Sequence, residues 1–145
     1  RRKVIGICFG HQLVAQALGG VVAKSPKGWG VGVHCYTVDR ENFDLADGEQ
    51  FCLLASHQDQ VMTMPPGATK IASNDHCEFA GMTLGQHMLT FQGHPEFIPA
   101  YSREIMTFRR EMIGAERVAE GIASLEEREH EGSRIARWIL AFLRR

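Results

Sequence analysis

The stretch Val4-Ile5-Gly6-Ile7-Cys8-Phe9-Gly10-His11-Gln12 decides how the rest of the chain is interpreted. A short apolar run meets a Gly-X-Cys-X-Gly turn, and a helical pattern begins directly after it. This order predicts a strand, a tight turn that carries a cysteine, and a helix, which is a nucleophile elbow with cysteine in place of serine. We expect Gly6 and Gly10 to give the turn its room.

The predicted elbow has a chemical consequence for Cys8. Its sulfur would stand at the N-terminus of the following helix, where free N–H groups and the helix dipole favour thiolate over thiol. The N–H of Phe9 would help to stabilise an oxyanion on a substrate. The alternative is that Cys8 is a small buried hydrophobe, as free cysteines usually are. The elbow alone does not decide between these interpretations.

Length and composition indicate an ordinary globular chain. It has 145 residues, 44% of them hydrophobic and 23% charged, so we treat 1–145 as a single domain. The net charge of −1 gives no basic field, so we expect no nucleic acid and no membrane surface as a partner. No apolar run approaches the roughly 20 residues of a membrane span. Arg1-Arg2-Lys3 leads directly into the elbow strand, so no signal peptide is expected.

The cysteines and histidines show no metal-ligand spacing. Cys8, Cys35, Cys52 and Cys77 are far apart and form no Cys-X-X-Cys pair. We therefore expect neither a zinc site nor a disulfide framework, but reduced thiols in the cytoplasm. His76-Cys77 is a weak metal signal, and the prediction is that no metal and no cofactor are bound.

The order of elements predicts an α/β domain with strand-rich insertions. Strands are expected at 4–7, 21–23, 31–38, 51–55, 69–72, 78–82 and 88–91, with a turn at Asp47-Gly48 and a polar loop at 56–60. Four helices are expected, each with one apolar face. The first face is formed by Leu13, Val14, Ala17 and Leu18, the second by Tyr101, Ile105, Phe108 and Met112, and the third by Val118, Ile122 and Leu125. The fourth is formed by Ile135, Trp138, Ile139, Phe142 and Leu143, in a helix that Ser133 is expected to cap.

A second stretch, Gly93-His94-Pro95-Glu96, supplies what a cysteine nucleophile needs. An imidazole base serves the cysteine, and a third group fixes the tautomer of the base. Side chains two residues apart in an extended segment point the same way, so Glu96 could accept the second ring N–H of His94. A surface turn with a stray ion pair is the alternative for this stretch alone. Taken with the elbow, the catalytic interpretation is favoured.

Three ordered segments resemble the signatures of the class I (triad) glutamine amidotransferases. They are Gly6-Ile7-Cys8-Phe9-Gly10-His11-Gln12, Ser56-His57-Gln58-Asp59-Gln60-Val61 and Gly93-His94-Pro95-Glu96, and the resemblance spans nearly the whole chain. It is closest to free-standing proteins such as γ-glutamyl peptidases and to the glutaminase domain of GMP synthetase. It implies a three-layer flavodoxin-like fold with a mixed, largely parallel sheet and flanking helices.

The resemblance also implies roles for individual residues. Cys8 would be the nucleophile, His94 the general base and then acid, and Glu96 its orienting partner. Phe9 would give one oxyanion donor, while Gln12, Ser56 and His57 would touch the amino-acid end of a glutamine or γ-glutamyl substrate. His11 has a structural or substrate-lining role in this interpretation.

The family's other oxyanion donor comes from a loop before the nucleophile strand, and no such loop precedes Arg1 in this sequence. A central nucleophile strand also needs neighbours on both sides. We therefore expect the chain to be the C-terminal part of a longer protein.

The resemblance leaves three functions open. The first is hydrolysis of a γ-glutamyl amide through a thioester. The second is a glutaminase subunit that feeds ammonia to a synthetase partner. The third is a non-catalytic binding protein that keeps the fold without turnover.

Overall fold

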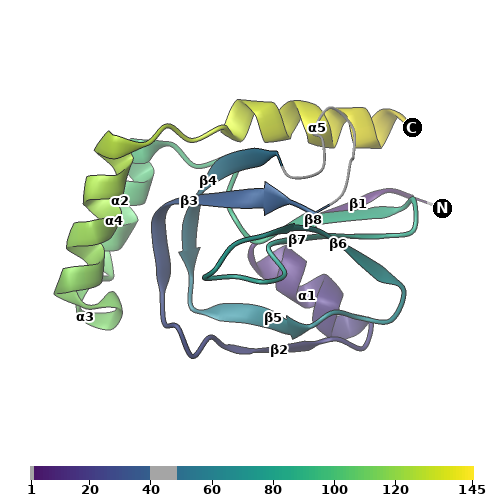
Figure 1. Cartoon of the computed structure of the whole chain (residues 1–145), viewed down its shortest axis with the longest axis horizontal. Coiled ribbons are helices and arrows are strands. Elements are labelled where there is room, and N and C mark those ends of the chain that lie inside the picture. Colours follow the sequence, from purple (N-terminus) through teal and green to yellow (C-terminus); the bar gives the residue numbers. More distant parts are fainter. Residues whose placement is uncertain (1, 40–48) are drawn as a thin grey trace.

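The chain folds as a mixed sheet with helices packed against it (Figure 1). The structure is a computed structural model that describes residues 2–39 and 49–145. The strands are β1 (Val4–Ile7), β2 (Val21–Lys24), β3 (Gly30–Val38), β4 (Gln50–His57), β5 (Asp59–Thr63), β6 (Ala68–Ser73), β7 (Gly81–Leu84) and β8 (Met88–Phe91). The helices are α1 (Phe9–Ala17), α2 (Pro99–Phe108), α3 (Arg110–Ile113), α4 (Ala115–Glu127) and α5 (Gly132–Arg144).

Six strands form the main sheet in the order β1-β8-β7-β6-β3-β4, and β2 pairs with β5 in a second, antiparallel sheet. Figure 1 shows α5 above the main sheet, with α1 and the β2–β5 pair below it. The expected α/β class with flanking helices is confirmed. The largely parallel sheet is not seen in the described part of the chain, because β1–β8 is its one parallel pair. β1, which leads into Cys8, is the outermost strand at one side of this sheet in the described residues.

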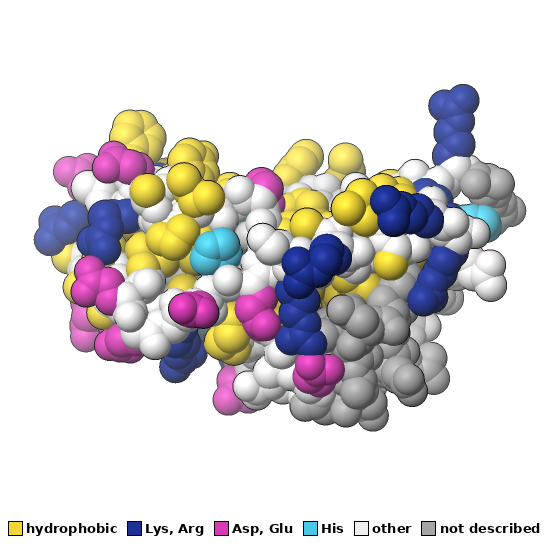
Figure 2. Space-filling model, turned by 90° about the horizontal axis from the view of Figure 1, so that it is seen from above, with side chains coloured by type: hydrophobic (Ala, Val, Ile, Leu, Met, Phe, Trp, Pro, Cys, Tyr) yellow, Lys and Arg dark blue, Asp and Glu magenta, His cyan; other side chains and the backbone are white. Residues whose placement is uncertain are grey.

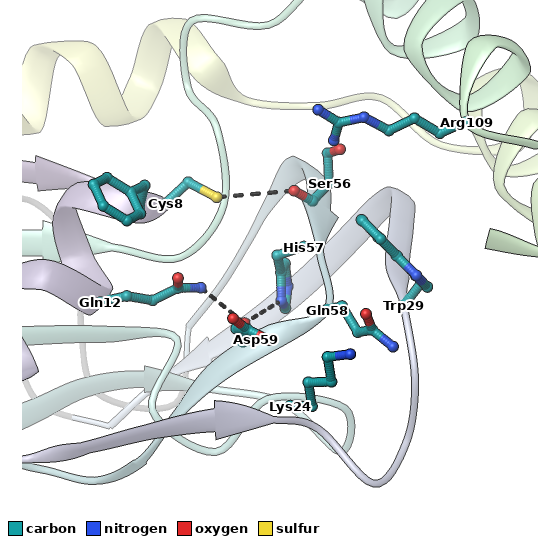
Figure 3. A pocket seen from close by; sticks show the side chains of 10 residues that line it. Cys8, Gln12, Lys24, Trp29, Ser56, His57, Gln58, Asp59 and Arg109 are labelled. Carbon is teal, nitrogen blue, oxygen red and sulfur yellow. Dashed lines mark hydrogen bonds between the residues drawn. The ribbon is translucent and has the colours of Figure 1, made fainter. Parts of the chain in front are cut away.

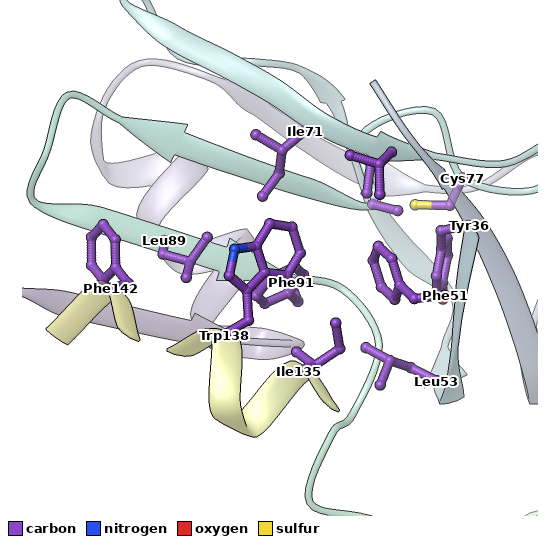
Figure 4. Close-up of a cluster of buried hydrophobic side chains, with 13 residues drawn as sticks. Tyr36, Phe51, Leu53, Ile71, Cys77, Leu89, Phe91, Ile135, Trp138 and Phe142 are labelled. Carbon is purple, nitrogen blue, oxygen red and sulfur yellow. The ribbon is translucent and has the colours of Figure 1, made fainter. Parts of the chain in front are cut away.

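The larger part of the core lies between α5 and the sheet (Figure 4). Trp138 of α5 packs against Phe91 of β8 and Phe51 of β4, with ring centroids 5.4 and 6.1 Å apart. Ile135 and Phe142 are buried on the same face of the helix, as their spacing predicts. Leu143 is 44% exposed, and the helix begins at Gly132 after Glu131, without a side-chain cap from Ser133. This packing holds β8, the strand that leads to the Gly93-His94-Pro95-Glu96 motif.

Helix α1 buries a different face from the one its apolar residues predict. Leu13 and Leu18 are 54% and 42% exposed, while His11, Gln12 and Ala15 are buried. His11 bonds through Nδ1 to Thr90 Oγ1 at 2.7 Å and through Nε2 to the Phe79 carbonyl at 2.8 Å. Because these partners satisfy the ring, burial of a polar side chain is tolerated here. His11 therefore has the structural role that was one of its two expected interpretations.

Burial lowers the pKa of His11 from 6.5 to about 4. The unfolded chain then binds a proton that the folded chain does not, so stability is lost as pH falls from about 6.5 towards 4. We expect wild type to lose about 2 kcal/mol through this residue between about pH 7 and 5, at roughly 1.4 kcal/mol per pH unit. Urea unfolding of wild type and His11→Gln at both pH values tests this, because glutamine does not titrate. An equal loss in both proteins would contradict it.

Cys35 and Cys52 form a disulfide, so the prediction that all four cysteines are reduced is wrong for this pair. The residues stand directly opposite each other in the antiparallel β3–β4 ladder. This proximity depends on the register of the two strands, and the separation of 17 residues in the sequence does not reveal it. Cys8 and Cys77 are free.

Two further predictions of local structure are wrong, and a third is not tested. The predicted loop at 56–60 is strand, because β4 runs to His57 and β5 begins at Asp59. The strand expected at 78–82 is displaced to β7, which begins at Gly81. The turn predicted at Asp47-Gly48 lies outside the described residues.

The predicted apolar face of α2 and α3 is also wrong, because Tyr101, Phe108 and Met112 are exposed, and Ser102 and Met106 face the core instead. Figure 2 shows hydrophobic side chains gathered over the end of the molecule that these helices form. Within the described part of the chain, no helix has the length and apolar character needed to cross a membrane.

Candidate active site

Cys8 occupies a strained turn between β1 and α1. Its backbone angles are φ 50° and ψ −101°, and it is the one non-glycine residue with positive φ within residues 2–39 and 49–145. Such strain is often found at functional positions. A Cβ on Gly6 would lie 2.8 Å from backbone atoms of Gly10, so the turn requires glycine at position 6. A Cβ on Gly10 would meet nothing within 4 Å, so the expectation that Gly10 supplies room is wrong.

The parallel pair β1–β8 brings both predicted motifs to one edge of the sheet. Ile7 lies beside Phe91, and the Cys8 N–H donates to the Phe91 carbonyl at 2.9 Å. Gln92 follows β8 and is fully buried. Its Nε2 donates to the Cys8 sulfur at 3.5 Å. Sequence analysis did not assign Gln92, although its position directly after β8 and before Gly93 is a signal that could have found it.

His94 lies beside the same stretch of β4 that Cys8 faces. The His94 N–H donates to the Leu54 carbonyl at 2.8 Å, and the Cys8 thiol points at the Ser56 carbonyl, with a distance of 3.8 Å from sulfur to oxygen. Leu54 and Ser56 are two residues apart on one strand, hence about 7 Å apart. Cys8 and His94 therefore approach from the ends of β1 and β8.

The His94 ring pairs with Glu96 as its spacing predicts. Nδ1 lies 2.6 Å from Glu96 Oε1, and the ring stacks on Phe97 with centroids 3.8 Å apart. The bond fixes the tautomer, so Nε2 is left to face a reacting group. The structure places no hydrogen bond between Cys8 and His94 within the described residues; the sulfur is held by Ser56 and Gln92 instead.

A cavity of about 280 Å³ lies in front of Cys8 (Figure 3). It gathers all four predicted substrate-binding residues, Phe9, Gln12, Ser56 and His57. It also contains residues that sequence analysis did not assign, namely Lys24, Trp29, Gln58, Asp59 and Arg109. Trp29 and Lys24 come from the β2–β3 segment and Arg109 from the end of α2. Their proximity to Cys8 depends on tertiary packing, so no local signal could have found them.

Burial raises the pKa of the Cys8 thiol above its ordinary value. The Phe9 N–H and the Gln92 amide oppose this effect, the Glu96 carboxylate adds to it, and the Arg109 guanidinium again lowers the pKa. The N–H at the start of α1 thus favours the thiolate, as expected, but desolvation is the largest effect and keeps the pKa of the thiol raised. A thiol with a raised pKa acts as a nucleophile only where a neighbouring base takes its proton.

Two of the substrate-binding candidates are held firmly by the protein. Gln12 Nε2 donates to the Asp59 carbonyl at 2.8 Å and to Gln92 Oε1 at 3.2 Å. His57 Nδ1 lies 3.2 Å from the Asp59 carbonyl. Burial, and then the charge of His34, lowers the pKa of His57 to about 3. His57 is thus neutral at pH 7 and lines the cavity. No group of three or more potential metal ligands occurs in residues 2–39 and 49–145.

Comparison with known proteins shows the family. The sequence model described as glutamine amidotransferase class-I matches residues 1–112, and the chain belongs to this family. It is 34% identical to γ-glutamyl peptidase 3 of Arabidopsis thaliana over 113 residues, which cover 73% of this chain and 44% of that protein. It is 38% identical over 102 residues to the glutamine-hydrolysing GMP synthase of Herminiimonas arsenicoxydans, covering 64% of this chain and 19% of that protein.

The fold is also that of solved family members. The crystal structure of a glutamine amido transferase from Methylobacillus flagellatus superposes with a TM-score of 0.71 and 24% identity, covering 97% of this chain and 61% of that one. The chain thus spans less than half of the Arabidopsis peptidase and about three fifths of this amidotransferase.

Proposed function

We propose that the protein hydrolyses a γ-glutamyl amide bond through a thioester on Cys8. The observation that carries this proposal is the strained elbow, which holds a free thiol at the wall of a cavity beside the end of β8, from which the His94–Glu96 pair follows. Membership of the class-I glutamine amidotransferase family supports γ-glutamyl chemistry, and one relative is named as a γ-glutamyl peptidase.

The first step forms the thioester. His94 takes the proton of the Cys8 thiol as the sulfur attacks the γ-carbonyl carbon, and the Phe9 N–H stabilises the oxyanion. The C–N bond then breaks, and His94 gives the proton to the departing amine. For this step the Cys8 thiol leaves the Ser56 carbonyl and moves along β4 towards His94, which is bonded to the Leu54 carbonyl. Glu96 holds the imidazole through Nδ1 and stabilises its charge.

The second step releases the product. His94 takes a proton from water, the hydroxide attacks the thioester carbon, the C–S bond breaks to give glutamate, and His94 returns the proton to the departing sulfur, which regenerates the free thiol. Gln12 Oε1 can accept a hydrogen bond from the glutamyl end, because both Nε2 hydrogens are already used within the protein. Ser56 and His57 complete this end of the site. The reaction requires no metal or organic cofactor.

A second function is a glutaminase subunit that passes ammonia to a synthetase partner, which the similarity to a GMP synthase favours. A third is a non-catalytic binding protein. In each case residues 1–145 act as part of a single amidotransferase domain. The cytoplasm is the proposed location, because free thiols such as Cys8 are kept reduced there. The Cys35–Cys52 disulfide counts against that location.

Substrate assays on the complete protein separate these functions. We expect release of glutamate from γ-glutamyl dipeptides or glutamine by the protein alone, and labelling of Cys8 by a glutamine-like electrophile that substrate prevents. Turnover of glutamine only in the presence of a synthetase would favour the subunit. A folded protein whose Cys8 neither labels nor turns over would favour the binding protein.

A further inference from the structure

The cavity in front of Cys8 continues past the reacting sulfur to Arg109. This residue follows the last residue of α2, and its side chain is half-buried. Figure 3 shows the guanidinium reaching over the cavity towards Ser56, on the wall that faces Cys8. The positive charge of Arg109 lowers the pKa of the Cys8 thiol. Arg109 thus stands within reach of a molecule bound at the nucleophile.

Arg109 carries a charge that the described residues do not neutralise. Its guanidinium has no hydrogen bond or ion pair to any side chain or carbonyl within residues 2–39 and 49–145. By contrast, Arg103 pairs with Glu126, and Arg134 pairs with Glu49 and Glu131. A planar guanidinium that lines a cavity with all donors free matches the geometry of a carboxylate.

Arg109 and Gln12 lie on opposite sides of the Cys8 sulfur (Figure 3). Figure 3 shows Arg109 above Ser56, whereas Gln12 and Asp59 lie below the sulfur. His94 is bonded to Leu54, two residues from Ser56 on β4, and so approaches from the Ser56 side. The acid that protonates a leaving amine must face that amine. The glutamyl end then lies towards Gln12 and His57, Ser56 stands between the two ends, and the leaving group lies towards Arg109.

Trp29 gives the same region a fixed apolar wall. Its indole is half-buried against the cluster of Val31, Met106, Ile113 and Val118. Arg117 of α4 donates hydrogen bonds to the carbonyls of Lys27 and Trp29, which ties this loop to the helix. Ammonia as leaving group has no apolar surface to pack on an indole and no carboxylate to bind a guanidinium. An amino acid as leaving group would use both.

We propose that Arg109 and Trp29 form a subsite for the leaving amine, in which Arg109 binds its carboxylate. The preferred substrates are then γ-glutamyl amino acids or peptides with a carboxylate close to the scissile bond, in preference to glutamine. This inference rests on the proposed γ-glutamyl hydrolysis, and it names the substrate class and the residue that selects it.

The test compares γ-glutamyl-alanine with γ-glutamyl-alanine amide, which differ in the carboxylate alone. For the complete wild-type protein we expect kcat/KM to be about 10-fold to 100-fold higher for the acid, as for a charge-assisted hydrogen bond. Arg109→Gln should bring the ratio close to 1, and Arg109→Lys should keep part of it. Arg110→Gln removes the neighbouring exposed arginine, which does not line the cavity, and should keep the wild-type ratio.

Equal losses for acid and amide in Arg109→Gln would overturn the proposal, since Arg109 would then bind the glutamyl end or only support the site. A wild-type ratio of kcat/KM for the acid over the amide that is close to 1 would also overturn the proposal. Calorimetric binding of both compounds to the Cys8→Ala protein gives the same comparison without turnover. Absence of hydrolysis with a preserved preference for the acid would reject the proposed hydrolysis while supporting the subsite. Absence of that preference in binding would reject the subsite.

Discussion

Cys8→Ala is expected to abolish hydrolysis of γ-glutamyl substrates, with a loss in kcat of at least about 10³-fold. No other group in the cavity can form the thioester, and loss of a nucleophile from a catalytic triad costs even more in well-studied hydrolases. Release of glutamate from a γ-glutamyl dipeptide by the complete protein measures the effect. Binding of substrate should survive, because the alanine leaves the cavity and its polar walls in place.

Cys77→Ala is the matched control for this variant. Cys77 is also a free thiol, but it is buried in the core, and burial raises its pKa to about 12. Its replacement should cost about 1 kcal/mol of stability through lost packing and should leave kcat unchanged. Activity that persists in Cys8→Ala, or that is lost equally in Cys77→Ala, would refute Cys8 as nucleophile.

Gly6→Ala should disrupt the elbow and lower activity at least tenfold. The new methyl group would lie 2.8 Å from the Gly10 carbonyl group and 2.9 Å from Thr90 Cγ2, so β1 and the start of α1 must move apart. Overpacking of this kind typically costs roughly 1–3 kcal/mol. The midpoint of urea unfolding and kcat/KM on the complete protein measure both effects.

Gly10→Ala tests the same turn from its other side. Nothing lies within 4 Å of the added methyl group, and the residue is helical. Stability should stay within about 1 kcal/mol of wild type, because alanine is favoured over glycine in a helix. If Gly10→Ala were as damaging as Gly6→Ala, the close approach at Gly6 would not be what the elbow requires.

The sequence predicts the parts of the site that have local signals. The elbow is one, because a strand, a turn and a helix follow each other around Cys8. His94 and Glu96 are another, because their chemistry and spacing suit each other. Arg109 and Trp29 carry no such signal, since the end of α2 and the β2–β3 loop meet Cys8 through tertiary packing alone.

The features of the fold that the sequence did not predict also depend on tertiary contacts. The predicted face of α1 is inverted because Thr90 and Phe79 satisfy His11 inside the core, which outweighs the apolar character of Leu13. The Cys35–Cys52 pair depends on the register of β3 and β4. Neither the partners of a polar side chain nor the register of two strands can be derived from a single sequence.

In the proposed reaction, Cys8 carries the γ-glutamyl group as a thioester. The most direct measurement is the mass of the Cys8 peptide after the complete protein is mixed with a γ-glutamyl dipeptide and quenched in acid. We predict an added mass equal to one γ-glutamyl group on Cys8, which disappears with hydroxylamine and is absent from Cys8→Ala. Steady turnover with Cys8 unmodified at every quench time, or with the γ-glutamyl group on another residue, would contradict the account.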